Sequence, residues 1–354
     1  MTEPADVVVA GAGLAGACAA LVLSRTRRVV VLEPGRPAGG ASGAAAGLAN
    51  PFMGRAAKPA WRHDEALDAL AELADETDDG LFRRTGVLRP AASGTQATTF
   101  RERAGAHTDL DWLDADASAE RWPLVSAPHG ALVVRRGGSV DLAAFVEAAL
   151  AVATARGARL VRARLTGWET DPLIAITDLG PIPTRALVLT LGDGARGLSA
   201  LTDLPLHRVK GQTVRLARPA VLPAGHHAVA GAGYVVPRAG DVVAGATFDH
   251  SFVDLAPDPV LDAGLASRAA ALVPSLAGAR VLGRAAGVRL TVPSVVSSRR
   301  LPLAGPLPGH PGVWVLTGLG AKGLVTAPLL ARLLPDALDG VRPLPAETAL
   351  APTV

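Results

Sequence analysis

The chain has 354 residues, of which 49% are hydrophobic and 19% charged, a composition that predicts packed cores and argues against extended disorder. Its net charge is +3, from 32 Arg and three Lys against 32 acidic residues, and no run of like charges forms the basic stripe typical of a nucleic-acid-binding protein. The single cysteine, Cys18, excludes an intrachain disulfide, a CxxC redox pair and a thiolate metal site, and we predict that it is a small buried helix residue.

The length favours two lobes around a shared cleft over a single core. The first residues lead straight into a strand, without the basic and apolar segments of a secretory signal. No window approaches the run of about 18 uncharged apolar residues that a transmembrane helix needs. We therefore expect a cytoplasmic protein without a membrane association.

The chain opens with a compact strand–helix–strand unit. A Val-rich strand at Asp6–Ala10 leads into a glycine-rich turn, an Ala/Leu-rich helix at Ala17–Ser24 and a second buried strand at Val29–Leu32. A Gly/Ala/Pro-rich loop at 35–54 follows, and its length is typical of functional loops. The elements predicted next are helices at 58–79, 114–121 and 141–156, and strands at 87–90, 160–169 and 173–178.

The second half of the chain changes character. The apolar run 186–191 predicts a third parallel strand of the first lobe. The β-rich segments 209–216, 234–237 and 242–246, with a turn at 238–241, predict an antiparallel sheet in a second lobe. The remaining predicted elements are a helix at 257–273, strands at 285–292 and 313–317, and a final helix at 323–338.

The first turn carries the pattern G-x-G-x-x-G between a strand and a helix, which is the context that a dinucleotide-binding turn requires. Gly11 permits the tight turn, Gly13 lets the backbone approach a pyrophosphate, and Gly16 lets the helix pack on the strand. The helix N-terminus favours phosphate. Glu33, 20 residues beyond Gly13, ends the next strand, where a carboxylate accepts hydrogen bonds from ribose hydroxyls and repels the 2′-phosphate of NADP.

The loop after Glu33 favours FAD over NAD. Its residues 39–51 read GGASGAAAGLANP, a run of small residues that lets the backbone press against a large planar ligand. Ser42 offers a hydroxyl to a phosphate. A low-complexity linker is the alternative interpretation of this run.

With these motifs the sequence resembles the D-amino-acid oxidase and glycine oxidase family of flavoproteins over nearly its whole length. The most specific match is the segment 315–328, VLTGLGAKGLVTAP, which resembles the family's last strand, glycine turn and helix. This segment is most similar to the flavin domain of the bifunctional enzyme that removes a carboxymethyl group during wobble-uridine tRNA modification. That enzyme's methyltransferase domain has no counterpart in this sequence.

The resemblance implies a set of FAD-binding residues. The stretch 157–167 is similar to the family's strand that contacts the adenine, and this similarity implies that Leu165 lies at the adenine. The stretch 186–192 is similar to the strand that closes the FAD site. The resemblance also implies that the N-terminus of the last helix, with Lys322 nearby, stabilises negative charge on the reduced flavin. The full set is Gly11, Ala12, Gly13, Leu14, Ala15, Gly16, Glu33, Ser42, Gly43, Ala45, Ala46, Gly47, Leu48, Leu165, Gly192, Gly318, Gly320, Ala321, Lys322, Gly323 and Leu324.

For the substrate, the resemblance implies Arg289 and Tyr234. Arg289 lies in a strand similar to the family's G-x-R-P-x-T, and an arginine fork suits a carboxylate. Tyr234, the only tyrosine, matches a family tyrosine whose hydroxyl contacts the same carboxylate. For each residue the alternative is an ordinary structural role, as a surface arginine or a packed strand residue.

The sequence departs from the family pattern near the flavin. The family's P-D-G-x-P is replaced by the longer segment 292–302 without an aspartate, and Leu319 stands where a histidine is frequent. Arg299 or Arg300 is therefore an alternative source of charge in the pocket. Three residues after the glycine-rich loop are further candidates to reach the cleft: Trp61, Arg62 and His63. Packing in the interior or exposure at the surface is the simpler interpretation for each. No metal-ligand spacing is present.

The predicted fold is α/β, with a Rossmann-like FAD-binding domain of the glutathione-reductase type and an interleaved antiparallel-sheet substrate domain. We expect residues 1–80, 140–205 and 290–354 to form the FAD-binding domain, and residues 81–139 and 206–289 to form the substrate-binding domain.

The predicted function is that of an FAD-dependent oxidoreductase. It would oxidise the C–N bond of an amino acid or secondary amine of the glycine, sarcosine or D-amino-acid type, by hydride transfer to flavin N5. Molecular oxygen or another acceptor would reoxidise the flavin. The alternative is removal of a carboxymethyl group from modified tRNA, a less favoured partner. A non-catalytic flavin protein also stays open, whereas the lack of CxxC disfavours a reductase.

Overall fold

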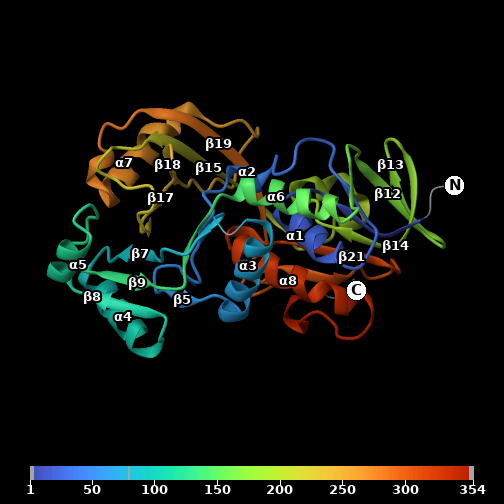
Figure 1. The fold of residues 1–354 in the computed structure, drawn as a ribbon, viewed down its shortest axis with the longest axis horizontal. Helices are drawn as coiled ribbons and strands as arrows, with labels where there is room; N and C mark the ends of the chain where they lie inside the picture. Colours follow the sequence, from blue (N-terminus) through green and yellow to red (C-terminus); the bar gives the residue numbers. More distant parts are fainter. Residues whose placement is uncertain (1–3, 79, 351–354) are drawn as a thin grey trace.

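The computed structural model describes residues 4–78 and 80–350, and its layout is governed by two large sheets lying side by side along the long axis (Figure 1). Among these residues, the first sheet has eight strands in the order β11-β2-β1-β14-β13-β12, with β21 paired to β14 and β20 to β21. Its strands are β1 (Ala5–Ala10), β2 (Val29–Leu32), β11 (Arg159–Val161), β12 (Leu165–Thr170), β13 (Leu173–Thr177), β14 (Gly180–Leu189), β20 (Leu303–Pro306) and β21 (Val313–Thr317).

The centre of this sheet is parallel, as its uninterrupted apolar runs predict. Strand β1 pairs in parallel with β2 and β14, and β14 with β21. Parallel strands that are covered on both faces read as continuous runs of Val and Leu, and all four residues of β2 are buried. On one face of this sheet, Val7 and Val9 pack with helices in one apolar cluster. On the other face, Val8 and Leu187 belong to a second apolar cluster.

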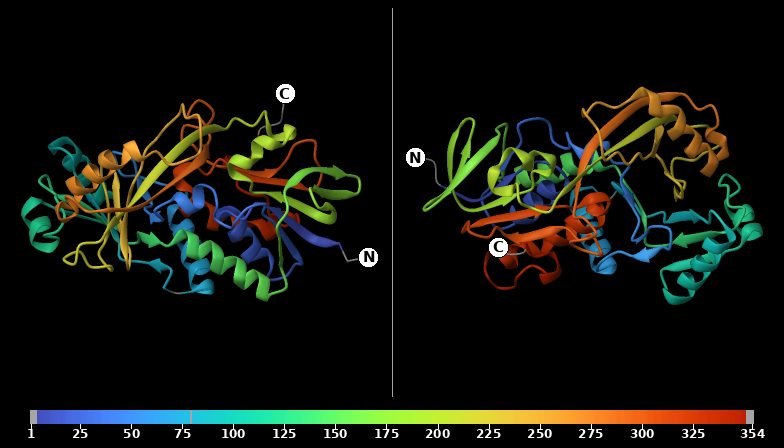
Figure 2. Two further views of the ribbon diagram at one scale, coloured as in Figure 1. Left: turned by 90° about the horizontal axis from the view of Figure 1, so that it is seen from above. Right: turned by 180° about the vertical axis from the view of Figure 1, so that it is seen from behind.

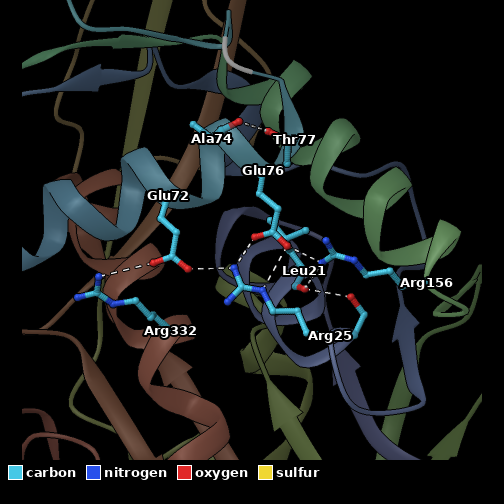
Figure 3. A network of polar contacts seen from close by, with 9 residues as sticks. Leu21, Arg25, Glu72, Ala74, Glu76, Thr77, Arg156 and Arg332 are labelled. Atoms are coloured by element: carbon cyan, nitrogen blue, oxygen red, sulfur yellow. Dashed lines mark hydrogen bonds and ion pairs between the residues drawn. The ribbon is translucent and has the colours of Figure 1, made fainter.

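Four helices contribute to the first of these clusters: α1 (Leu14–Leu23), α3 (His63–Thr77), α6 (Leu142–Ala155) and α8 (Gly323–Leu338). An ion-pair network joins their ends at the surface (Figure 3). Arg25, after α1, pairs with Glu72 and Glu76 of α3, and Arg156 at the end of α6 pairs with Glu76 as well. Burial raises the pKa of Glu76, but the hydrogen bonds from the two arginines outweigh it and hold that pKa below its ordinary value.

The second sheet, also of eight strands in the described residues, runs in the order β19-β15-β18-β17-β16-β7-β9-β8 and is mostly antiparallel. Its longest strands, β15 and β19, extend back toward the first lobe, as two further views show (Figure 2). The strands are β7 (Val87–Pro90), β8 (Leu110–Leu113), β9 (Ala131–Val134), β15 (His207–Ala217), β16 (Ala228–Ala230), β17 (Tyr234–Pro237), β18 (Asp241–Gly245) and β19 (Val281–Thr291).

Helix α7 (Asp262–Leu272) packs on one face of this sheet through Leu265, Ala269 and Leu272. On the other face lies a cluster that includes Phe100 of α4 (Gly94–Ala106), and α5 (Ala115–Arg121) follows β8. The short elements between the lobes are α2 (Ala41–Ala44), β3 (Leu48–Ala49), β4 (Phe52–Met53), β5 (Lys58–Pro59), β6 (Phe82–Arg83) and β10 (Gly138–Val140).

The mixed α/β prediction is confirmed. The strands of the second sheet come from two separated stretches, 87–134 and 207–291, and those of the first sheet from 5–32, 159–189 and 303–317. The division into two domains stays a prediction; β19, a strand of the second sheet, ends at Thr291, two residues into the last segment predicted for the FAD-binding domain. Cys18 is buried in α1, as predicted, and its burial raises the pKa of the thiol.

Several predicted boundaries were wrong. The helix predicted at 58–79 begins at His63, because Lys58–Pro59 pairs with Phe52–Met53 as a hairpin; Asp79, its predicted last residue, lies outside the described residues. The strand predicted at 160–169 is two strands, β11 and β12, in different parts of the sheet. The helix predicted at 257–273 begins at Asp262, after two prolines at 257 and 259.

Other differences concern elements that the sequence did not predict. Helix α4 was missed because its sequence is polar, and only Ala97 and Phe100 are buried. Helix α1 begins three residues earlier than predicted, inside the glycine motif. Strands β8, β9 and β20 were also missed. No helix in the described part of the chain has the length and apolar character needed to cross a membrane.

Candidate active site

The first glycine turn joins β1 to α1, and steric contacts dictate its glycines. Gly11 has φ +105°, and a Cβ atom there would lie 2.6 Å from the Thr190 carbonyl oxygen. A Cβ atom on Gly16 would lie 1.8 Å from the Gly11 carbonyl oxygen, so that only glycine lets the helix reach the strand. The N-terminus of α1 consequently opens at the end of β1, where unpaired N–H groups favour an anion.

Glu33 follows β2 and holds this turn in shape. One carboxylate oxygen accepts a hydrogen bond from the Ala12 N–H at 3.0 Å, and the other accepts one from the Gly35 N–H at 2.9 Å. Each oxygen keeps a further lone pair, so the carboxylate could still accept from a ribose hydroxyl. The motif predicts a ribose contact for Glu33 but not these two backbone bonds.

Ser42, in α2, reaches the same helix from the glycine-rich loop. Its hydroxyl oxygen accepts the Leu14 N–H at 2.9 Å, which leaves the hydroxyl proton available to an acceptor such as a phosphate. The second sheet packs on this loop, since Thr213 Oγ1 donates to the Ala44 carbonyl at 3.0 Å and a Cβ on Gly287 would lie 2.7 Å from Ala41 Cα. The loop is therefore the layer between the two lobes.

The last glycine turn joins β21 to α8. Gly318 and Gly320 have φ +71° and +54°, which a side chain would disfavour. A Cβ on Gly320 would lie 3.0 Å from Thr291 Oγ1, at the end of β19. Lys322 lies beside this turn, and its ammonium donates to the Arg299 carbonyl. Burial and the neighbouring charge of Arg300 lower the pKa of Lys322.

Both turns and the loop open into one cavity of about 1680 Å³. The predicted cofactor residues that line it are Gly11, Gly13, Leu14, Ala15, Glu33, Ser42, Ala45, Ala46, Gly47, Leu48, Leu165, Gly192, Gly318, Gly320, Ala321, Gly323 and Leu324. Four predicted residues do not line it: Ala12, Gly16, Gly43 and Lys322. Ala12 and Gly16 shape the first turn instead, and Gly43 packs against the Ala38 carbonyl, 2.3 Å from where a Cβ would lie.

This wall of the cavity fits a dinucleotide such as FAD. Its surface is mostly Gly, Ala and Leu, and a Cβ added at Gly40 would meet nothing within 4 Å, so the loop leaves open space beside the turn. Helix N-termini lie at both glycine turns, and a carboxylate lies at the end of β2. These are the groups that bind phosphates and ribose.

Arg289 and Tyr234 line the same cavity from the second sheet. The Arg289 guanidinium donates to the Thr247 carbonyl at 3.3 Å and lies 4.6 Å from the centroid of the Phe248 ring. Within the described chain, no carboxylate lies within 4.0 Å of it, and burial lowers its pKa. Burial also raises the pKa of Tyr234 to about 12, against the opposing charge of Arg289, so the phenol is neutral at ordinary pH.

Other residues singled out in the sequence do not line the cavity. Trp61 packs in the first core, and its indole N–H donates to Glu347 Oε1 at 3.4 Å. Arg62 and His63 begin α3 outside the cavity, and Arg299 and Arg300 do not reach it either. His63, Asp64 and Asp109 could share a cation, but Arg136 already pairs with Asp64 at 2.7 Å and lies 3.9 Å from Asp109.

Several cavity residues were not predicted from the sequence, among them Arg89, His129 and Phe248 of the second lobe and Arg55 of the β4–β5 hairpin between the lobes. Arg89 offered a signal, because an arginine within the short apolar strand 87–90 is unusual for a buried position. The other three lie on loops and carried no local pattern.

Comparisons with known proteins agree with this geometry. A family model described as FAD-dependent oxidoreductase, DAO, matches residues 6–337. The tRNA 5-methylaminomethyl-2-thiouridine biosynthesis bifunctional protein MnmC of Thiobacillus denitrificans is 31% identical over 98% of this chain, which spans 58% of that protein's length. Glycine oxidase of Pseudomonas aeruginosa is 29% identical, with 96% of each chain covered.

The fold agrees as well. The crystal structure of glycine oxidase from Geobacillus kaustophilus matches with a TM-score of 0.85 and 24% identity, covering 100% of both chains. The family model spans most of the chain, and FAD is the cofactor of this family. The protein is thus an FAD-dependent enzyme and belongs to the DAO family of oxidoreductases.

Proposed function

We propose that this enzyme oxidises the C–N bond of an amino acid or secondary amine that carries a carboxylate, of the glycine, sarcosine or D-amino-acid type. One observation carries the proposal. Arg289 is a half-buried guanidinium without a carboxylate partner in the described chain, and it lines the same cavity as both glycine turns. A buried charge of this kind is costly unless a ligand neutralises it.

Arg289 would bind and orient the substrate carboxylate. Its planar fork offers two parallel charge-assisted hydrogen bonds, and such bonds fix direction as well as position. Its contact with the Thr247 carbonyl and the Phe248 ring leaves other N–H donors of the guanidinium available. Tyr234, held neutral by burial, would donate its hydroxyl proton to the same carboxylate.

The bound FAD supplies the acceptor for the hydride that leaves the substrate carbon. The substrate nitrogen must arrive unprotonated, because its lone pair becomes the second bond of the C=N product. Water then adds to that imine and gives a carbonyl compound and an amine. Among the described residues that line the second-lobe wall there is no Asp or Glu, so the reaction is proposed without a carboxylate base on that wall.

We call Arg289 and Tyr234 the carboxylate clamp. The same clamp would serve a second candidate substrate, the carboxymethylamino group of a modified wobble uridine. The observation that favours it is the 31% identity to the MnmC protein over nearly the whole of this chain. In that reaction the clamp would hold the carboxymethyl group, and the nucleoside would extend into the rest of the cavity.

An anaerobic screen tests both candidates. The purified yellow protein is mixed with glycine, sarcosine, D-amino acids or modified tRNA, and bleaching of the flavin absorption is followed. Bleaching by free amino acids supports the first candidate, and bleaching by modified tRNA alone supports the second. Oxygen uptake after re-aeration identifies an oxidase. If neither class bleaches the flavin, both candidates are wrong.

A further inference from the structure

The second-lobe wall of the cavity carries positive charge that the carboxylate clamp does not use. Besides Arg289, this wall includes Arg55, Arg89 and His129, and no acidic side chain of the described residues lines it. The cavity's two acidic lining residues, Glu33 and Asp193, belong to the nucleotide side. Glu33 is bonded to backbone N–H groups, and Asp193 pairs with Arg208 at 2.6 Å. We call the part around Arg55, Arg89, Gln96 and His129 the distal arm.

Arg89 is the buried charge of this arm. Its side chain is 7% exposed, its Nη1 donates to the Phe52 carbonyl at 2.6 Å, and its Nη2 donates to the Gly54 carbonyl. Its Nε has no partner in the described chain, and no carboxylate there lies within 4.0 Å. Burial lowers its pKa to about 10, which leaves it charged at neutral pH. The two bonds fix the segment that carries Arg55.

A second set of contacts ties Arg55 to helix α4. Gln96 Nε2 donates to the Arg55 carbonyl at 2.7 Å, and Gln96 Oε1 accepts the Ala92 N–H at 2.7 Å. Ser93 Oγ accepts the Gln96 N–H at 3.2 Å and so caps the start of this 13-residue helix, while the Gln96 side chain accepts from the residue before that cap. The positive end of α4 and the exposed Arg55 side chain therefore face one cavity arm together.

The arm lies well away from the clamp along the sheet. Arg89 is on β7, two strands from β17, which carries Tyr234. Since neighbouring strands are about 4.8 Å apart, this separation is roughly 10 Å. A group bound in the arm would therefore belong to a part of the substrate remote from the oxidised bond.

Resting on the proposed amine oxidation, we propose that the distal arm binds a second anionic group, a carboxylate or a phosphate, on the substituent of the substrate. The substrate class is then an N-substituted or side-chain-extended amino acid with an acidic tail, and the clamp and the arm hold its two ends. Two arginines and a histidine in one arm, with no acidic side chain of the described residues lining it, are the observation behind it.

The test compares matched ligands on the FAD-loaded enzyme. N-alkylglycines of increasing tail length end in a carboxylate, a phosphonate or a neutral carboxamide. Dissociation constants are read anaerobically from the shift of the flavin absorption, and bleaching is recorded separately. We expect an acidic tail of fitting length to bind about tenfold more tightly than its carboxamide. The carboxylate and phosphonate series then distinguish the two anion sources.

Variants locate the effect. In Arg55→Gln and in His129→Gln the preference for the acidic tail should fall to about threefold or less. The control is Arg101→Gln, an exposed arginine of the same helix α4 that does not line the cavity; it should keep the tenfold preference. Equal affinity for acidic and neutral tails at every length, or a preference that survives both substitutions, would overturn the inference. Failure of every amine to bleach the flavin would instead count against the proposed oxidation.

Discussion

The two walls of the cavity are built on different principles. The nucleotide wall is made of backbone and small residues: two glycine turns, a loop of Gly and Ala, and the carboxylate of Glu33 bonded to main-chain N–H groups. The substrate wall is made of long side chains from a mostly antiparallel sheet, with Arg289, Arg89 and Tyr234 buried or half-buried. A wall made of backbone tolerates little change, whereas a wall made of side chains allows the substrate to vary.

The contrast also concerns charge. On the nucleotide wall each described acidic lining group already has a partner within the protein. On the substrate wall the arginines hydrogen-bond to carbonyls and stack on aromatic rings, Arg289 on Phe248 and Arg89 on Phe100. Such contacts orient a guanidinium without neutralising it. The acidic groups of the nucleotide wall are therefore paired within the described chain, whereas these two arginines have no carboxylate partner there.

The largest effect is expected on the nucleotide wall, from Gly16→Ala. The added Cβ would lie 1.8 Å from the Gly11 carbonyl oxygen, so the helix must move away from the strand. We expect the variant either to fail to fold or to fold without retaining FAD. The ratio of flavin to protein absorbance measures it. Gly197→Ala, an exposed position with no atom within 4 Å of the new Cβ, should retain its flavin; a fully loaded Gly16→Ala protein would contradict the steric argument.

Arg289→Ala tests the substrate wall. Without its arginine partner, the substrate carboxylate should lose about 2–5 kcal/mol of transition-state stabilisation, which is roughly 30-fold to several thousand-fold in kcat/KM. The flavin content should stay unchanged. Steady-state kinetics on an amine that bleaches the flavin measure the change. The matched control is Arg284→Ala on the same strand, whose partner is Asp262 outside the cavity. Unchanged kinetics for Arg289→Ala would remove the clamp assignment.

Glu33→Ala probes the polar part of the nucleotide wall. The substitution leaves the Ala12 and Gly35 N–H groups without their acceptor, at a cost of about 1–3 kcal/mol, which is roughly five- to 150-fold in FAD affinity. Titration of the apoprotein with FAD measures it. Glu33→Gln keeps one acceptor oxygen, so its loss should be smaller. If both variants bind FAD like the wild type, the carboxylate does not organise the turn.

The smallest expected effect is the titration of Tyr234. Its signal is specific because Tyr234 is the only tyrosine. Its phenol should ionise near pH 12 in the folded protein and near pH 10 after unfolding. Between these values the unfolded chain loses the proton first, so the free energy of unfolding should fall as the pH rises. The phenolate absorbance measures the titration, with Tyr234→Phe as the blank. Ionisation near pH 10 in the native protein would show that the hydroxyl is not buried.

The sequence predicted the nucleotide wall well because that wall depends on local rules. Gly11, Gly13 and Gly16 lie within six residues, and Glu33 follows at the end of the next strand, so spacing alone brings them together. The strands β2 and β21 and the helix α8 were predicted to the residue, since both strands are uninterrupted apolar runs and glycines flank β21 and begin α8. Resemblance to the flavoprotein family supplied Leu165 and the last turn.

Tertiary structure alone decided the rest. Ser42 bonds to Leu14 across 28 residues, and Arg89 reaches the carbonyls of Phe52 and Gly54, contacts that no local pattern encodes. The ammonium of Lys322, a residue predicted from its place in the motif to lie near the reduced flavin, donates to the Arg299 carbonyl, another contact that no local pattern encodes. Backbone conformation is fixed by neighbours in the chain, whereas the direction and surroundings of a long side chain depend on strands that meet only when the two lobes pack together.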